Sequence, residues 1–182
     1  MVVERDARDS ARFERTVLPH LDAGYTLALY LTHDAFDAED AVQEAVLRAL
    51  RYFHTLRDDR DARGWFLAIV RRESYDARGG GRAAAQMVPY DEGVHGEVAD
   101  RKPSPEDAAQ SSDVAGRVRA AIATLPDRLR ETLILREIQQ CSYEEIAMIT
   151  DAPIGTVMSR LSRARARLAE QLAGAMDVRE LP

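Results

Sequence analysis

The sequence is poor in the residues that build disulfide-linked, metal-binding or membrane-spanning proteins. Its 182 residues include a single cysteine, Cys141, so no internal disulfide can form and no cysteine cluster can hold a metal. No hydrophobic run approaches the roughly 18 residues of a membrane span, and the N-terminal stretch lacks the apolar segment of a signal peptide. We therefore expect a reduced, cytoplasmic protein with no cofactor and no membrane insertion, in which Cys141 is a small buried hydrophobe.

Aromatic residues are also few, at 6%, whereas Ala, Leu, Arg and Glu are abundant. Unbranched side chains lose little rotamer freedom in a helix, so this composition favours helices over sheets. Hydrophobic residues make up 46% of the chain against 31% charged residues, which is enough apolar material to bury a core. We predict an all-α protein.

Glycine and proline are concentrated in the middle of the chain. Helical periodicity stops at the three consecutive glycines that begin with Gly79, and the residues that follow have mixed charge and few large apolar side chains. This composition is typical of a flexible linker. We predict two small helical domains, at residues 1–78 and 113–182, joined by a flexible linker at residues 79–112.

Basic residues are fewer than acidic ones, so the net charge is -6, and no segment is basic overall. Residues 153–170 are nevertheless locally basic, with four arginines against the single acid Glu170. Such concentration is expected when one surface must meet a polyanion and the rest of the protein should not.

The C-terminal segment has the pattern of a helix-turn-helix. Ser142 and Glu145 have the spacing of a capping box, which predicts a short helix that begins at Tyr143. Residues 150–152 fit a tight turn, and Pro153 suits the first turn of a second helix. The second helix of this motif can enter the major groove of DNA.

That second helix has an apolar stripe, formed by Val157, Leu161, Ala164 and Leu168, and a separate polar and cationic face. Arginines can bond to phosphates and guanine edges, and hydroxyl groups add further hydrogen bonds. An arginine-rich helix can also be a solvated surface helix, but the capping box and the turn favour DNA recognition. The predicted DNA-reading residues are Thr156, Ser159, Arg160, Arg163 and Arg167.

A helix in the N-terminal domain carries a cluster of acidic and amide side chains. Asp37 can cap this helix, and the exposed positions hold Glu39, Asp40, Gln43 and Glu44, while its inner face holds Val42, Ala45, Val46, Ala49, Leu50 and Phe53. Acids near a helix start interact favourably with its dipole, so stability explains part of the cluster. The same surface also suits a docking partner.

The next helix combines aromatic and basic side chains. It begins near Trp65 and Phe66 and ends with Arg71, Arg72, Tyr75 and Arg78. Such side chains suit both core packing and single-stranded nucleic acid. From the residues alone, core packing is the simpler explanation for Trp65 and Phe66.

Three stretches together carry a family resemblance. They read DAEDAVQEAVLRALRYF, RGWFLAIVRRESYD and LPDRLRETLILREIQQCSYEEIAMITDAPIGTVMSRLSRARARL. In order and spacing they resemble the extracytoplasmic-function sigma factors of bacterial RNA polymerase. The resemblance implies core RNA polymerase and promoter DNA as partners, and an inhibitory anti-sigma factor as a third.

The resemblance also implies roles for particular residues. The acidic helix would bind the largest polymerase subunit through Asp37, Glu39, Asp40, Gln43 and Glu44. The following helix would recognise and help to melt the minus-ten promoter element through Trp65, Arg71, Arg72, Tyr75 and Arg78. The helix-turn-helix would read the minus-thirty-five element through Thr156, Ser159, Arg160, Arg163 and Arg167.

Four features of the sequence depart from the family pattern. Arg72 stands where asparagine is common, and glycines replace the basic run that often follows this helix. Asp151 stands where glycine is frequent, and Met158 stands where lysine is frequent, which removes one possible phosphate contact. Neither Asp151 nor Met158 breaks the helix-turn-helix pattern.

Other functions fit the sequence less well. A dimeric helix-turn-helix regulator is disfavoured by the acidic helix and the long linker, because symmetric operators require a rigid dimer. A sigma-like decoy that binds only an anti-sigma factor is disfavoured by the arginine face. An enzyme fits least, since no metal cluster, phosphate-binding glycine loop or nucleophile arrangement is apparent.

Overall fold

The computed structural model describes the backbone of residues 2–79 and 105–177, and side chains within residues 9–78 and 114–173. The helices are α1 (Val2–Thr16), α2 (Leu21–Thr32), α3 (Ala35–Tyr52), α4 (Ala62–Gly79), α5 (Pro105–Ala123), α6 (Asp127–Glu137), α7 (Tyr143–Thr150) and α8 (Ile154–Asp177). No strand occurs in these ranges, and the all-α prediction is confirmed. Across the same ranges, each helix is too short or too polar to cross a bilayer.

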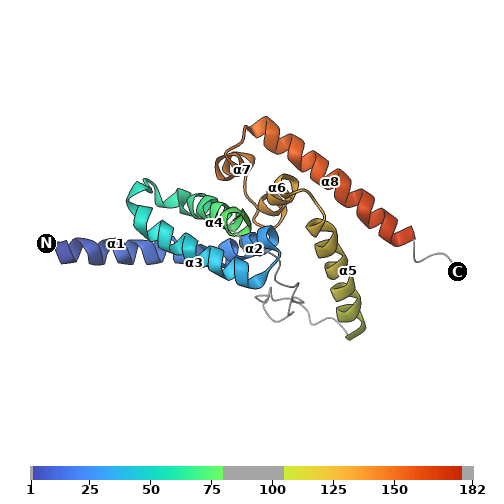
Figure 1. Ribbon diagram of the computed structural model, residues 1–182, viewed down its shortest axis with the longest axis horizontal. Coiled ribbons are helices and arrows are strands. Elements are labelled where there is room, and N and C mark those ends of the chain that lie inside the picture. The colour runs from blue at the N-terminus through green and yellow to red at the C-terminus, as the bar shows by residue number, and fades with distance from the viewer. Residues whose placement is uncertain (1, 80–104, 178–182) are drawn as a thin grey trace.

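Helices α1 to α4 form the first domain (Figure 1). The buried face of α3 consists of Ala38, Ala41, Ala45 and Ala49, whose small side chains let α2 and α4 approach closely. At Gly24 of α2, an added Cβ would lie 2.9 Å from Phe66, so only glycine fits beneath that ring. This packing holds α3 and α4 in fixed register and leaves the polar face of α3 outward.

Two details of α3 differ from expectation. Asp34, and not Asp37, caps the helix, because its Oδ1 accepts hydrogen bonds from the backbone N–H groups of Phe36 at 2.8 Å and Asp37 at 3.0 Å. Leu50, which we placed on the inner face, is 52% exposed. The alanine stripe is narrower than the apolar sequence pattern, so the face that packs inward is narrower too.

The second domain contains the predicted helix-turn-helix. Ser142 Oγ accepts from the N–H of Glu145 at 3.1 Å, and the N–H of Ser142 donates to Glu145 Oε2 at 2.6 Å. Asp151 follows α7 with a left-handed φ of 50°, the conformation that the turn requires. The capping box, the start at Tyr143 and the turn are therefore confirmed.

The last part of the predicted linker is helical, although its composition indicates a flexible segment. Helix α5 begins at Pro105, ahead of Asp113, where we expected helical patterning to resume. The rest of the predicted linker, residues 80–104, lies outside the described residues.

The two domains pack against each other through a shared apolar cluster. Leu27, Leu31 and Leu67 of the first domain are fully buried in the same cluster as Ile134 and Ile146 of the second. In Figure 1, α6 and α7 lie between α8 and the first domain. We call this contact of α2 and α4 with α6 and α7 the interdomain seam.

We predict that Ser142→Ala lowers the free energy of unfolding by about 1 kcal/mol, because it removes the acceptor of the capping box. The matched control is Ser162→Ala, which changes an exposed serine within α8. Chemical denaturation measures both. Equal stability of the two variants would contradict a capping role for Ser142.

Candidate functional surfaces

The acidic side chains of α3 form an outward surface. Glu39, Asp40, Gln43 and Glu44 are exposed, and Asp37 is half-buried. The surface is concave, since Asp40, Gln43 and Glu44 line a pocket of about 310 Å³ with Glu73 and Asp76 of α4. We call this the acidic surface.

Glu73 forms the floor of the acidic surface. It is 8% exposed, and its carboxylate lies 2.9 Å from the Nε of Arg48. Burial raises the pKa of Glu73, and the neighbouring Arg48 opposes that rise. Several carboxylates around a partly buried one favour a cationic partner, whose charge would relieve their mutual repulsion.

Helix α4 separates the predicted minus-ten residues onto two faces. Trp65 packs edge-on to Phe53, with ring centroids 6.5 Å apart, and also lines a pocket of about 350 Å³ that reaches Met148 of α7. Arg72 is exposed and lies 4.0 Å from Asp76. Arg72 is directed to Asp76 of its own helix, whereas Trp65 borders a pocket that the second domain also lines. The contact of Trp65 with Phe53 agrees with the core-packing interpretation.

The other three residues of α4 face the second domain. Arg71 Nε donates to Glu131 Oε2 at 2.8 Å, and the Tyr75 hydroxyl donates to the same oxygen at 2.7 Å. Arg78 lies 3.0 Å from Asp127. Burial and the adjacent Glu131 carboxylate raise the pKa of Tyr75, so its hydroxyl stays a proton donor.

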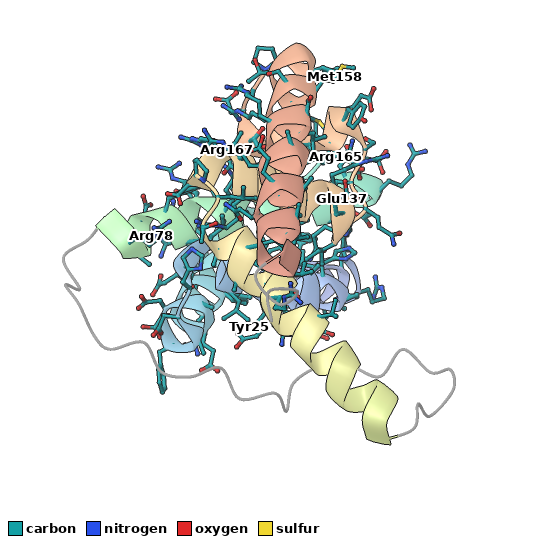
Figure 2. All side chains as sticks on the ribbon, turned by 90° about the vertical axis from the view of Figure 1, so that its right-hand side faces the viewer. Tyr25, Arg78, Glu137, Met158, Arg165 and Arg167 are labelled. Carbon is teal, nitrogen blue, oxygen red and sulfur yellow. The ribbon has the colours of Figure 1, made fainter. Side chains whose placement is uncertain are left out.

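The cationic face of α8 is mostly open to solvent. Ser159, Arg163 and Arg167 are exposed, and Arg163 bonds only within its own helix, to Ser159, among the described residues. Thr156 is half-buried. Figure 2 shows Arg167 and Arg165 on opposite flanks of the helix, where Arg165 lies 2.6 Å from Glu137.

Arg160 differs from the other residues on this face. Its side chain is only 19% exposed, and its guanidinium lies 3.8 Å from Glu131. The structure therefore turns Arg160 toward the interdomain seam, whereas Arg163 and Arg167 point outward.

Two residues that sequence reasoning missed join the domains. Glu131 is completely buried and forms ion pairs with side chains of both domains. Arg63 donates to the backbone oxygen of Gln139 and, at 3.0 Å, to its side chain, whose amide in turn donates to the Ala23 carbonyl at 3.3 Å. In the sequence both are charged residues on predicted helices, and nothing local distinguishes them from solvated ones.

Cys141 is buried beside this network, as predicted. It is 1% exposed, and its sulfur lies 3.6 Å from a guanidinium nitrogen of Arg63. Burial raises the pKa of the Cys141 thiol, which keeps it protonated at neutral pH.

Comparisons with known proteins find a matching family model in each half of the chain. A family model of Sigma-70 region 2 matches residues 16–82, and one of Sigma-70, region 4 matches residues 115–168. The RNA polymerase sigma-H factor of Pseudomonas aeruginosa is 34% identical over 172 residues, covering 90% of this chain and 88% of that protein. The ECF RNA polymerase sigma-E factor of Escherichia coli is 35% identical over 134 residues, covering 71% of this chain and 70% of that protein.

A solved structure agrees with these relatives. The sigma factor RpoE from Bartonella quintana, in complex with the anti-sigma factor NepR, has a TM-score of 0.65 and 30% sequence identity to this chain. The likeness covers 88% of this chain and 96% of that one.

We predict that Leu67→Ala lowers the free energy of unfolding by about 2 to 5 kcal/mol, because it leaves a cavity in the cluster that both domains share. Amide hydrogen exchange should then accelerate in α6 as well as in α4. Leu47→Ala is the control, since Leu47 is 57% exposed on α3. Faster exchange confined to α1–α4 would contradict a shared core.

Proposed function

Because the chain belongs to the extracytoplasmic-function sigma factors of bacterial RNA polymerase, we propose that it uses the surfaces described above to direct promoter-specific initiation. It is a dissociable specificity subunit of the polymerase and supplies recognition, while the polymerase supplies the chemistry. Its place of action is that of the polymerase, the cytoplasm. The observation that carries the assignment of roles is the separation of an acidic surface on α3 from an arginine face on α8.

The acidic surface is the proposed attachment site for core polymerase. Its residues Asp37, Glu39, Asp40, Gln43 and Glu44 lie on one face of a helix whose other face is locked by the alanine stripe. A rigid, concave, negatively charged surface steers a basic partner toward it and fixes the orientation of docking.

The arginine residues of both domains are the proposed promoter contacts. Arg163 and Arg167, with Ser159, present an open cationic face for the major groove of the minus-thirty-five element. Trp65, Arg71, Arg72, Tyr75 and Arg78 offer stacking and phosphate contacts for a displaced strand at the minus-ten element. Thr156 and Arg160, which are half-buried, lie at the border of the cationic face of α8.

The negative net charge supports attachment before recognition. A net charge of -6 weakens nonspecific attraction to DNA phosphates. Docking on polymerase raises the effective concentration of the local arginines near a promoter and compensates for that weakness. An anti-sigma partner fits the same logic, because a protein that covers these surfaces would keep the factor inactive, and the similar RpoE was solved with one.

We predict that the double reversal Asp40→Arg and Glu44→Arg weakens binding to core polymerase by about a hundredfold or more, because attraction becomes repulsion. Fluorescence titration with purified core polymerase measures the affinity. The control is Asp9→Arg with Glu14→Arg, which changes the net charge equally on the exposed side of α1. Equal losses in both pairs would show that only net charge matters and would remove the assignment to α3.

We predict that Arg163→Ala reduces transcription by about tenfold while core binding is unchanged, because it deletes a phosphate or base contact. The template is a promoter selected from a randomised library by the wild-type holoenzyme. Arg165→Ala is the control, since it removes an equal charge from the same helix on the flank held by Glu137. Indistinguishable transcription by the two variants would contradict the role of Arg163.

A further inference from the structure

The first two turns of α8 carry an exposed apolar pair beside the proposed minus-thirty-five surface. Met158 is 53% exposed, and Ile154 is 43% exposed. The two residues are four positions apart, so their side chains lie one turn apart on the same flank of the helix. Figure 2 shows Met158 near one end of α8, on the flank where Arg165 lies. Arginine contacts with DNA do not account for these two apolar side chains.

Met158 and Arg163 lie at opposite edges of the outward face of α8. At about 100° per residue, the positions that face away from the buried stripe are Gly155, Ser159 and Ser162, and all three are exposed. A Cβ added at Gly155 would meet no atom of the described residues within 4 Å, so this face is open. Because the central side chains are small, the backbone of α8 can approach the floor of a major groove closely. The long side chains at the two edges then reach bases on either side.

We propose that Met158 is a specificity-determining residue of the minus-thirty-five contact, which reads the C5-methyl group of a thymine, with Ile154 beside it on the same flank. The inference rests on the proposed function, because it assumes that α8 enters the major groove. It adds the base that the apolar edge selects, which the arginine contacts leave open.

The choice of thymine follows from the chemistry of the major groove. Guanine, adenine and cytosine present hydrogen-bond donors or acceptors there, whereas thymine presents a methyl group beside its single acceptor. A methionine side chain offers an apolar stem and only a weak sulfur acceptor. Against the polar base edges, Met158 would displace water without replacing the lost hydrogen bonds, which is unfavourable. Against a thymine methyl group, it removes apolar surface from water on both sides.

The positions and shapes of the two apolar residues suit this contact. The N-terminal residues of a recognition helix are the ones that contact base edges, and both residues lie at the start of α8. The side chain of Met158 is unbranched and adapts to the place of the methyl group. Ile154 is β-branched and stiff, so it forms a fixed apolar wall one turn earlier.

The charges on the two edges of the outward face also differ. Arg165 follows Met158 two turns later on the same flank, but its guanidinium lies 2.6 Å from Glu137 and is engaged within the protein. On the other edge, Arg163 bonds only within its own helix among the described residues. One edge therefore offers a free cation for phosphates or guanine, and the other offers an apolar surface for a methyl group.

The test removes one methyl group at a time from the DNA. The holoenzyme binds a double-stranded promoter that the wild-type holoenzyme has selected from a randomised library. Each thymine of the minus-thirty-five element is replaced in turn by deoxyuridine, which lacks only the C5-methyl group. We expect one such replacement to weaken wild-type binding about fourfold, as expected for one methyl group returned to water. The same replacement should leave binding by Met158→Ala unchanged, because the partner of that methyl group is absent. Fluorescence anisotropy measures both affinities.

Two variants show whether the methyl effect belongs to Met158. Met148→Ala removes a methionine that is 66% exposed on α7, and it should keep the fourfold effect. Arg163→Ala should bind the promoter more weakly and still keep the effect, since Arg163 lies on the other edge of α8. Met158 is exposed and alanine favours helices, so Met158→Ala should retain its fold, which circular dichroism checks.

A second measurement repeats the library selection with the Met158→Lys holoenzyme. The preference for thymine at the sensitive position should be lost, because a cation replaces the apolar side chain. The rest of the selected element should be retained, since the other edge of α8 is unchanged.

The proposal is overturned if no deoxyuridine replacement weakens wild-type binding, or if the effect persists in Met158→Ala. It is also overturned if Met158→Ala weakens binding to core polymerase in the absence of DNA, which would assign the apolar pair to a protein contact. Failure of the proposed function gives a different result. In that case the wild-type chain does not join core polymerase, or its holoenzyme selects no common minus-thirty-five element.

Discussion

The interaction on which the structure most depends is the buried contact of Glu131 with side chains of both domains. Arg71 and Tyr75 reach this carboxylate from α4, and Arg160 approaches it from α8. A fully buried carboxylate is costly without hydrogen-bond and ion-pair partners, so its position depends on theirs. The relative placement of the domains is thus tied to a few charged atoms and to the leucines packed around them.

The charged side chains of the chain differ in whether they lie inside or outside the interdomain seam. The acidic surface of α3 lies outside the seam, while three proposed DNA-contacting side chains of α4 lie within it. The open arginines of α8 are the exception, and there the negative net charge of the chain limits unspecific attraction to DNA.

Much of the local structure could be predicted from the sequence because it rests on short-range rules. The capping box at Ser142, the turn at Asp151 and the stripe of Val157 and Leu161 all depend on neighbours within a few residues. The cap of α3 was missed because Asp34 and Asp37 are both acceptable caps in the sequence, and only the structure shows that the helix begins directly after Asp34. The exposure of Leu50 was missed because the apolar sequence pattern of α3 is wider than the alanine stripe that packs inward.

The seam could not be predicted in this way. Leu27, Leu31 and Leu67 have the spacing of ordinary core residues, and periodicity does not say whether the core belongs to one domain or is shared by two. Glu131 likewise reads as a surface acid, because only its partners from distant helices make its burial possible. Family resemblance names the surfaces proposed for polymerase and DNA, but the contacts of Arg71, Tyr75 and Arg78 with α6 follow only from the three-dimensional structure.

The most direct test of the account is the distance between the domains before and after polymerase binds. Dyes at Arg51→Cys and Glu170→Cys, both exposed positions, would report it by energy transfer, while buried Cys141 stays unlabelled. The account predicts high transfer in the free protein and a marked drop when core polymerase is added without DNA. Unchanged transfer in a holoenzyme that transcribes its promoter would contradict it.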